Sequence, residues 1–145
     1  MKKIWFDMDG TIANLYAVEN WLDFLLNSDP MPYKCAKPIG NFSVLARFLN
    51  KAQKNGVKIG IISWTSKNST KKYENDVISA KIEWLKAHLP SVKWDFVYIV
   101  PYGTKKSLFK AENDILFDDE LQNRNDWGKN GLEPTEIFRV LKRVA

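Results

Sequence analysis

The chain contains one cysteine and one histidine, and each scarcity excludes a kind of chemistry. With Cys35 alone, no disulfide can form within the chain, which is typical of proteins kept in a reducing compartment. A zinc site needs several cysteine or histidine ligands, and His88 has no second one near it in the sequence. We therefore expect a cytoplasmic protein that has neither a disulfide nor zinc.

Long apolar runs are missing as well. No run approaches the ~20 residues that a membrane-spanning helix needs. The apolar stretch after the basic start is interrupted at Asp7, so we expect no signal peptide and no membrane partner. The length of 145 residues fits one domain covering 1–145, and 45% hydrophobic with 27% charged residues is typical of a globular domain.

Basic residues outnumber acidic ones by 22 to 17, which gives a net charge of +5. This balance is compatible with anionic substrates, nucleic acid among them. However, the basic residues are scattered through predicted helices instead of forming one stripe: Lys51, Lys54, Lys71, Lys72, Lys81, Lys86, Arg139, Lys142 and Arg143. We interpret them as solvated helix faces, so nucleic acid is not the favoured partner.

Apolar strand-like runs alternate with helical patterns along the chain. The pattern predicts strands at 3–7, 58–63, 96–100 and 115–117, and helices at 43–55, 71–89 and from Pro134 onward. Such alternation is typical of an α/β domain, in which helices cover a central parallel sheet.

One segment, 13–42, is longer than this alternation requires. Its first part, 15–26, is predicted to be an amphipathic helix, with apolar residues at Leu15, Val18, Leu22, Leu25 and Leu26. Its second part, 28–40, contains three prolines and is predicted to be irregular. The segment is either an insertion with a function of its own or an extra helix and loop packed on the domain.

The most informative stretch is 4–11, in which three large apolar residues precede Asp7-Met8-Asp9-Gly10-Thr11. The apolar residues indicate the end of a buried strand, and Gly10 frees the backbone to turn away from it. The two carboxylates then lie at the mouth of a sheet, where one can attack phosphorus while the other transfers a proton. The alternative interpretation is an ordinary Asp-Gly turn.

Three other predicted strands are also followed by residues that can carry chemistry. Ser63 ends the second strand, Lys105 and Lys106 follow the third, and Asp118 and Asp119 end the fourth. Because parallel strands end at one edge of the sheet, we expect these side chains to converge there. Two adjacent buried acids repel each other and shift each other's pKa, which is an argument for a bound cation.

These four segments, in this order, resemble the four motifs of the haloacid dehalogenase superfamily of aspartate-nucleophile phosphatases. The resemblance spans residues 4–119. It implies a Rossmann-like three-layer sandwich with a central parallel sheet, in which 13–42 is a small helical cap over the active site. The small cap and Phe117-Asp118-Asp119 are similar to the 5'-nucleotidase branch.

The resemblance also implies a role for each motif residue. Asp7 is the expected nucleophile, and Asp9 is the expected general acid and base. Ser63 is expected to bind a phosphoryl oxygen, with Trp64 at the mouth of the site. The active-site lysine is expected to be Lys106, with Lys105 as the alternative.

A magnesium ion is the expected cofactor, because a phosphate dianion repels a carboxylate nucleophile and Mg²⁺ prefers oxygen ligands. Its expected ligands are Asp7, the backbone carbonyl of Asp9, and Asp119, with Asp118 behind them. Whether Asp118 or Asp119 contacts the metal directly stays open at this point.

The implied function is hydrolysis of a phosphomonoester, with a nucleotide as the preferred substrate. Tyr16, Trp21 and Tyr33 in the segment 13–42 could stack on a base. The alternatives are a phosphatase that acts on polynucleotide ends, and a non-enzymatic binding protein that keeps the fold.

Overall fold

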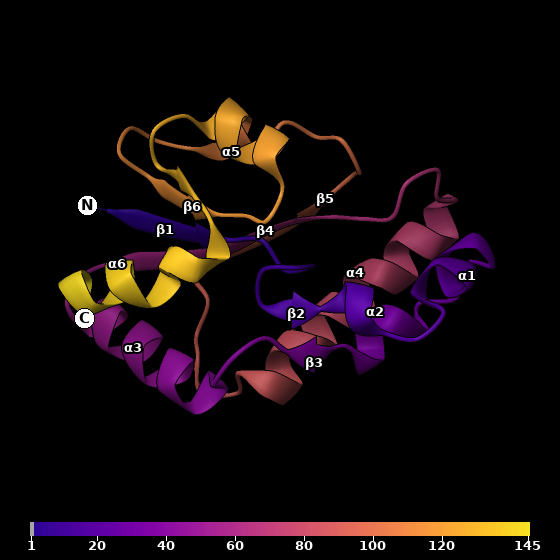
Figure 1. The fold of residues 1–145 in the computed structure, drawn as a ribbon, viewed down its shortest axis with the longest axis horizontal. Coiled ribbons are helices and arrows are strands. Elements are labelled where there is room, and N and C mark those ends of the chain that lie inside the picture. The colour runs from indigo at the N-terminus through magenta and orange to yellow at the C-terminus, as the bar shows by residue number, and fades with distance from the viewer. Residues whose placement is uncertain (1) are drawn as a thin grey trace.

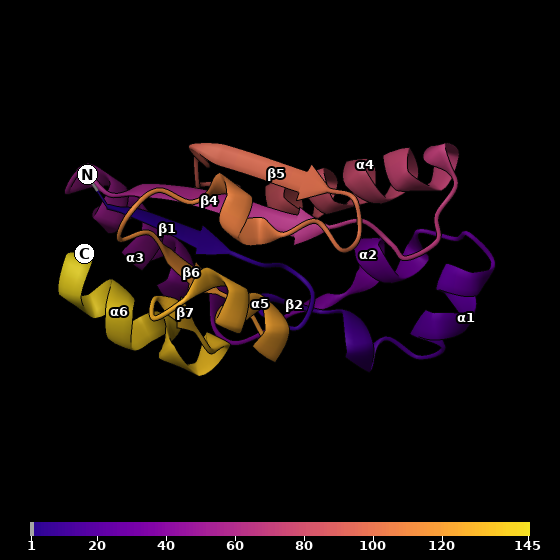
Figure 2. The ribbon, with the colours of Figure 1, turned by 90° about the horizontal axis from the view of Figure 1, so that it is seen from above.

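The structure, a computed structural model, describes residues 2–145 and is built around a five-stranded parallel sheet (Figures 1 and 2). In spatial order the strands are β5 (Phe96–Val100), β4 (Lys58–Trp64), β1 (Lys3–Phe6), β6 (Ile115–Phe117) and β7 (Gly131–Leu132). All four neighbouring pairs are parallel. The predicted α/β architecture with a central parallel sheet is therefore confirmed.

Strand β1 lies at the centre of the sheet because its side chains are apolar on both faces. Ile4 is in register with Ile59 on one side and Ile115 on the other. Ile4 and Phe6 contribute to the larger core, whereas Trp5 packs into a separate cluster on the opposite face. A strand covered on both faces reads as a continuous apolar run, which is what the sequence shows here.

Helices cover both faces of this sheet. The larger core joins β1 and β4 to α3 (Phe42–Lys54), α4 (Lys71–His88) and α6 (Ile137–Val144), which lie together below the sheet in Figure 1. Helix α5 (Leu121–Trp127) lies above it, where Trp127 packs with Trp5. Short 3₁₀ turns, η2 (Lys106–Phe109) and η3 (Pro134–Glu136), precede β6 and α6.

Most of the predicted elements are confirmed within one or two residues. The bounds of β5 and β6 agree with the prediction, and both long predicted helices begin at a side-chain cap. Asn41 accepts a hydrogen bond from the Val44 N–H, and Thr70 accepts one from the Tyr73 N–H. Helix α5 and strand β7 were not predicted from the sequence, because both are short and carry no strong period.

The segment 13–42 differs from the prediction in both of its parts. It forms β2 (Ala13–Asn14), η1 (Leu15–Ala17), α1 (Trp21–Leu26), α2 (Met31–Cys35) and β3 (Lys37–Pro38). The single helix predicted over 15–26 is wrong, because Asn20 adopts a left-handed conformation with φ 58° and separates η1 from α1.

The irregular conformation predicted for 28–40 is also wrong. Pro32 occupies the first turn of α2, where the missing N–H costs no helical hydrogen bond. Strand β3 pairs with β2 in antiparallel fashion and closes the segment into a loop. Leu15 and Tyr33 pack against Tyr73 and Val77 of α4, so the segment lies beside α4 near the carboxyl ends of the strands (Figure 2).

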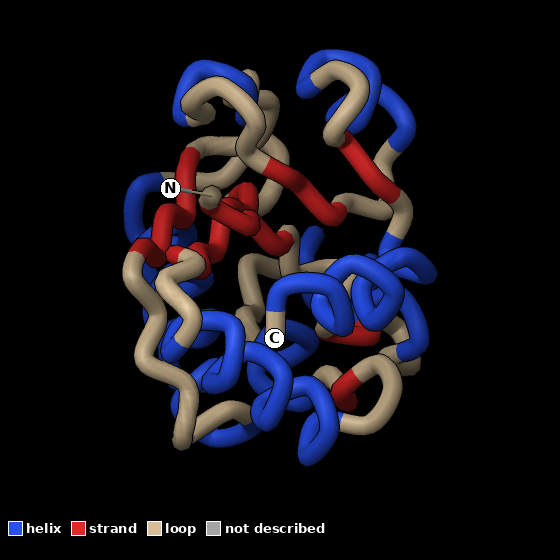
Figure 3. Tube along the Cα trace, turned by 90° about the vertical axis from the view of Figure 1, so that its left-hand side faces the viewer, coloured by secondary structure: helices blue, strands red, loops and turns tan. Residues whose placement is uncertain are grey.

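Figure 3, a tube view along the longest axis of the domain, shows helices above and below the strands. None of the helices within residues 2–145 is long and apolar enough to cross a membrane.

Candidate active site

Three carboxylates meet where β1 and β6 end. The backbone pairing of these neighbouring strands continues past their ends, since the Asp7 N–H donates to the Phe117 carbonyl at 2.9 Å. Asp7 leaves β1 at the same level at which Asp118 and Asp119 leave β6. One carboxylate oxygen from each of the three lies within 4.8 Å of the others. The predicted convergence at this edge of the sheet is therefore present.

Asp7 is buried, and both of its carboxylate oxygens accept hydrogen bonds. Lys106 Nζ donates to Oδ1 at 2.9 Å, and Thr11 Oγ1 donates to Oδ2 at 3.2 Å. Thr11 reaches back to Asp7 because Gly10, with φ 80°, turns the chain directly after the acids. The motif thus fixes the orientation of its own first carboxylate.

Lys106 supplies the positive charge at this site. It lies at the start of η2, is 3% exposed, and donates to Asp118 Oδ2 at 2.7 Å as well as to Asp7. Although burial opposes the charged form, the carboxylates of Asp7 and Asp118 raise the pKa of Lys106 above its ordinary value. Lys105 is exposed, so the structure places Lys106, not Lys105, beside the carboxylates.

Asp118 has its hydrogen-bonding capacity filled by protein groups. It is fully buried, Oδ1 accepts from the Glu120 N–H, and Oδ2 accepts from Asn123 as well as Lys106. Burial, followed by the charge of Asp7, raises the pKa of Asp118 to about 6. Asn123 comes from α5, so this short helix holds the second acid in place.

The carboxylate of Asp119 receives far fewer hydrogen bonds from protein groups than that of Asp118. Its only side-chain donor among residues 2–145 is Thr11, whose Oγ1 lies 3.5 Å from Oδ1. Burial, followed by the charge of Asp7, raises the pKa of Asp119 to about 8. A carboxylate that faces other carboxylates and lacks a strong donor is a fitting ligand for a hard cation. The donor set of the site therefore fits a magnesium ion.

Asp9 points to a different partner. Its Oδ2 accepts from Lys81 Nζ at 2.7 Å, and the side chain of Lys81 is 1% exposed. The interpretation of Lys81 as part of a solvated helix face is therefore wrong. Burial raises the pKa of Asp9, and the ammonium of Lys81 opposes part of that rise.

The same ammonium also contacts Ser63, the predicted phosphate-binding hydroxyl. Ser63 is fully buried, and its Oγ accepts from Lys81 Nζ at 2.7 Å. The next residues along the chain, Trp64, Thr65 and Ser66, line the neighbouring cavity, whereas Ser63 lies behind its wall. The hydroxyl of Thr65 is buried there and has no hydrogen-bond partner in the described part of the chain.

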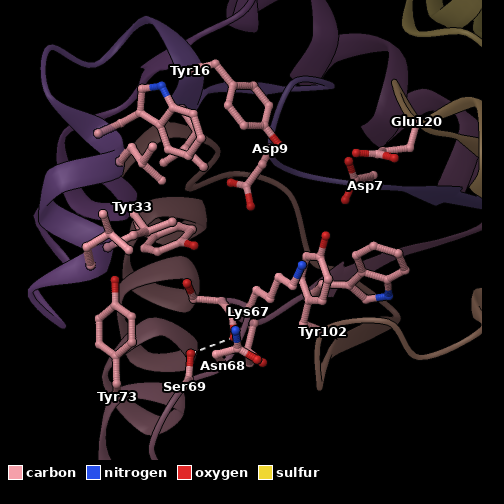
Figure 4. Close-up of a pocket in the computed structure, with 18 of the residues that line it drawn as sticks. Asp7, Asp9, Tyr16, Tyr33, Lys67, Asn68, Ser69, Tyr73, Tyr102 and Glu120 are labelled. Atoms are coloured by element: carbon pink, nitrogen blue, oxygen red, sulfur yellow. Dashed lines mark hydrogen bonds between the residues drawn. The ribbon is translucent and has the colours of Figure 1, made fainter.

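A cavity of about 530 Å³ opens beside these residues and is lined by Asp7, Asp9, Lys106 and Asp119. Much of the remaining wall is aromatic, and Figure 4 shows Tyr16 and Tyr33 beside Asp9 and Tyr102 across from them. Tyr16 packs edge-on against Trp21 with ring centroids 5.1 Å apart, and Trp64 packs against Tyr102 at 4.9 Å. All three aromatic residues singled out in 13–42 line this cavity.

Lys81 is the main functional candidate that the sequence analysis missed, yet its spacing carried a signal. It lies four residues after Val77 and four before Leu85, within the buried stripe of α4. A lysine inside an apolar stripe needs a buried partner, because an unpaired charge is costly there. Asn123 gave no comparable signal, since α5 was not predicted.

Comparisons with known proteins place the fold. No protein-family model matches this sequence, and no curated protein matches it. Among solved structures, the chain is similar to the D,D-heptose 1,7-bisphosphate phosphatase from Burkholderia thailandensis, with a TM-score of 0.56 and 11% identity. The match covers 91% of this chain and 75% of that one. At this identity the likeness concerns the fold, which is a Rossmann-like α/β fold of the haloacid dehalogenase type.

Proposed function

We propose that this protein is a magnesium-dependent phosphatase that hydrolyses a phosphomonoester through an aspartyl-phosphate on Asp7. One observation carries the proposal: Lys106 is buried between Asp7 and Asp118, with Asp119 beside them, and Asp7, Lys106 and Asp119 line a cavity. The fold of the solved phosphatase described above is consistent with it.

Asp7 is the proposed nucleophile because its carboxylate lines the cavity, while hydrogen bonds from Thr11 and Lys106 fix the orientation of that carboxylate. Attack of a carboxylate oxygen on phosphorus forms an acyl phosphate and expels the alcohol. Lys106 uses two of its three N–H donors on Asp7 and Asp118. Its third donor is available for an oxygen of the transferring phosphoryl group.

Asp9 is the proposed general acid and base. It lines the cavity two residues after the nucleophile, and its Oδ2 is held by Lys81. As an acid it would protonate the departing alcohol oxygen, and as a base it would take a proton from the water that attacks the acyl phosphate. A raised pKa favours the protonated form that the first of these steps needs.

The proposed ligands for Mg²⁺ are the carboxylates of Asp7 and Asp119 and the backbone carbonyl of Asp9. Asp118 would stand behind them, since its own oxygens already accept from Glu120, Asn123 and Lys106. When bound there, the ion would offset the negative charge of the phosphoryl group.

A nucleotide is the proposed substrate, and segment 13–42 is the proposed cap. The cavity of about 530 Å³ lies within the range usual for sites that take small ligands. Aromatic side chains enter it from 13–42 (Tyr16, Trp21 and Tyr33) and from the sheet edge (Trp64 and Tyr102). Flat apolar rings on two sides suit a planar base better than a sugar alone.

The direct test is a screen of phosphomonoesters with purified protein and Mg²⁺. It should contain nucleoside monophosphates, sugar phosphates, sugar bisphosphates and oligonucleotides phosphorylated at either end. We expect phosphate release from nucleoside monophosphates, loss of release in chelator, and recovery with Mg²⁺. Preference for oligonucleotide ends would support the alternative substrate, and release that is unaffected by chelator would refute the proposed chemistry.

A further inference from the structure

Lys81 connects two of the site's motifs through one buried ammonium. Its Nζ lies 2.7 Å from Asp9 Oδ2, 2.7 Å from Ser63 Oγ and 2.7 Å from the Trp64 carbonyl. The first acceptor follows β1, and the other two belong to the end of β4. The lysine itself comes from the middle of α4, so three elements meet at this atom.

The three contacts use every donor that the group has. An ammonium has three N–H bonds and no acceptor site, so Lys81 has no hydrogen bond left for a substrate. The ring of Tyr33 in α2 lies 5.1 Å from Nζ and covers it further. Lys81 therefore differs from Lys106, which keeps one donor for a ligand, and it can act only through the groups that it holds.

For Ser63 the contact fixes the direction of the hydroxyl. Because an ammonium can only donate, Ser63 Oγ must be the acceptor in this pair. The proton of Ser63 must then point elsewhere, and no hydrogen bond within residues 2–145 has the Ser63 hydroxyl as its donor. Because Ser63 is fully buried behind the cavity wall, the contact serves to tie Lys81 to the end of β4.

For Asp9 the contact holds one of the two carboxylate oxygens in place. Oδ2 is tied to Lys81, so Oδ1 is the oxygen left to face the cavity that Asp9 lines. A proton donor has to lie within hydrogen-bond reach of the leaving oxygen, and a misplaced one loses much of its effect. Without Lys81, the carboxylate could rotate or turn toward solvent, since 18% of its side chain is exposed.

We propose that Lys81 is a positioning residue that anchors the carboxylate of Asp9 to the end of β4, an inference that rests on the proposed phosphatase function. It holds the proposed proton donor, which follows β1, against Ser63 and the Trp64 carbonyl of β4. The competing explanation is that Lys81 only neutralises a buried carboxylate and so affects folding alone.

The test compares Lys81→Met with Lys86→Met on two substrates, a nucleoside monophosphate and nitrophenyl phosphate. Methionine keeps the length of the side chain without the ammonium. Lys86 is the matched control, because it lies on the same helix and is exposed, with Glu83 as its partner. Nitrophenolate leaves without protonation, so its hydrolysis depends little on Asp9.

We expect kcat of Lys81→Met to fall about 100- to 1,000-fold on the nucleotide but only about 10-fold on nitrophenyl phosphate. KM should change much less than kcat. With nitrophenyl phosphate, whose first step needs little protonation, a phosphate adduct on Asp7 should accumulate and be visible by mass spectrometry. Lys86→Met should behave as the unchanged chain. An equal loss on both substrates, or none, would overturn the inference.

A second pair of variants covers the case in which Lys81→Met does not fold. Asp9→Asn/Lys81→Met removes both partners of the ion pair, so no unpaired charge is left buried. Relative to Asp9→Asn alone, the second substitution should leave the ratio of kcat on the two esters unchanged. A further selective loss on the nucleotide would refute action through Asp9. If the unchanged chain hydrolyses no phosphomonoester, the proposed function itself fails. If the unchanged chain is active but Lys81→Met does not alter the ratio of kcat on the two esters, only the inference about Lys81 fails.

Discussion

Gly10 and Asp119 occupy adjoining space, and a side chain on the first would displace the second. A Cβ atom at position 10 would lie 2.6 Å from Cγ of Asp119. The glycine also adopts φ 80°, a conformation that residues with a side chain rarely take. The glycine of the first motif is thus required twice, once for the turn and once for the approach of an acid that is 109 positions away.

Gly10→Ala should therefore lower activity by more than its effect on folding explains. We expect kcat to fall at least about 10-fold, because moving a proposed metal ligand by about 1 Å misplaces the reacting groups. Gly56→Ala is the matched control: its φ is 90°, but no atom of the described residues lies within 4 Å of the added Cβ. If both variants lose stability equally and keep full kcat, the contact with Asp119 does not matter for the reaction.

Substitution of Asp7 and of Asp9 should give different signatures. Asp7→Asn should abolish phosphoryl transfer, because an amide is too weak a nucleophile. Asp9→Asn should keep the first step for nitrophenyl phosphate but slow the breakdown of the acyl phosphate, so that a phospho-enzyme accumulates. Mass spectrometry after addition of substrate should find the adduct on Asp7. An adduct on Ser63, or full turnover by Asp7→Asn, would refute the assignment.

The two adjacent lysines give a second matched pair. Within residues 2–145, Lys106→Met removes the only ammonium that contacts Asp7, and we expect kcat to fall at least about 100-fold. Lys105 is exposed, so Lys105→Met should retain activity within about twofold. Circular dichroism should show both variants folded before rates are compared. A larger loss in Lys105→Met than in Lys106→Met would reverse the assignment of the active-site lysine.

The acidic pair should make the metal-free protein less stable as the pH rises. The folded chain raises the pKa of Asp118 to about 6 and that of Asp119 to about 8, from an ordinary value of 3.8. The folded state then keeps protons that the unfolded chain has already released. The stabilisation is complete below pH ~4 and is lost as the pH rises through ~6 and ~8.

Magnesium competes with those protons, so its effect on stability should show the opposite trend. In thermal melts, Mg²⁺ should raise the melting temperature more at pH 8 than at pH 5. Asp119→Asn should weaken both the pH dependence in chelator and the shift with Mg²⁺. A magnesium shift that is equal at both pH values, or is kept in Asp119→Asn, would count against the proposed ligands.

The aromatic side chains that line the cavity should affect the binding of a nucleotide, and not the rate of phosphoryl transfer. Trp21→Ala removes a ring that lines the cavity and packs against Tyr16. A lost stacking contact is worth about 1–3 kcal/mol per base, so KM for a nucleoside monophosphate should rise about 10-fold or more. Nitrophenyl phosphate should be affected less, and Tyr98→Ala, on β5 outside the cavity wall, should leave KM unchanged. An equal rise in KM for both esters would argue against base stacking.

The sequence by itself determined the elements whose signal is local. Strands such as Phe96–Val100 and Ile115–Phe117 are short apolar runs between breakers, and the caps at Asn41 and Thr70 act within three residues. Asp7 and Asp9 could be singled out in the same way, because the turn that follows them is encoded by the adjacent Gly10. These features depend on neighbours in the chain, so a linear pattern is enough to find them.

Only the tertiary structure decided which side chains meet. The sequence favoured Lys106 but left Lys105 as the alternative, and the turn η2 buries Lys106 against Asp7, 99 positions away. Lys81 looked like one of many surface lysines until the packing of α4 placed it between Asp9 and Ser63. The break at Asn20 and the pairing of β2 with β3 likewise depend on how segment 13–42 packs against α4. Burial and charge pairing are properties of three-dimensional neighbours, which local periodicity does not encode.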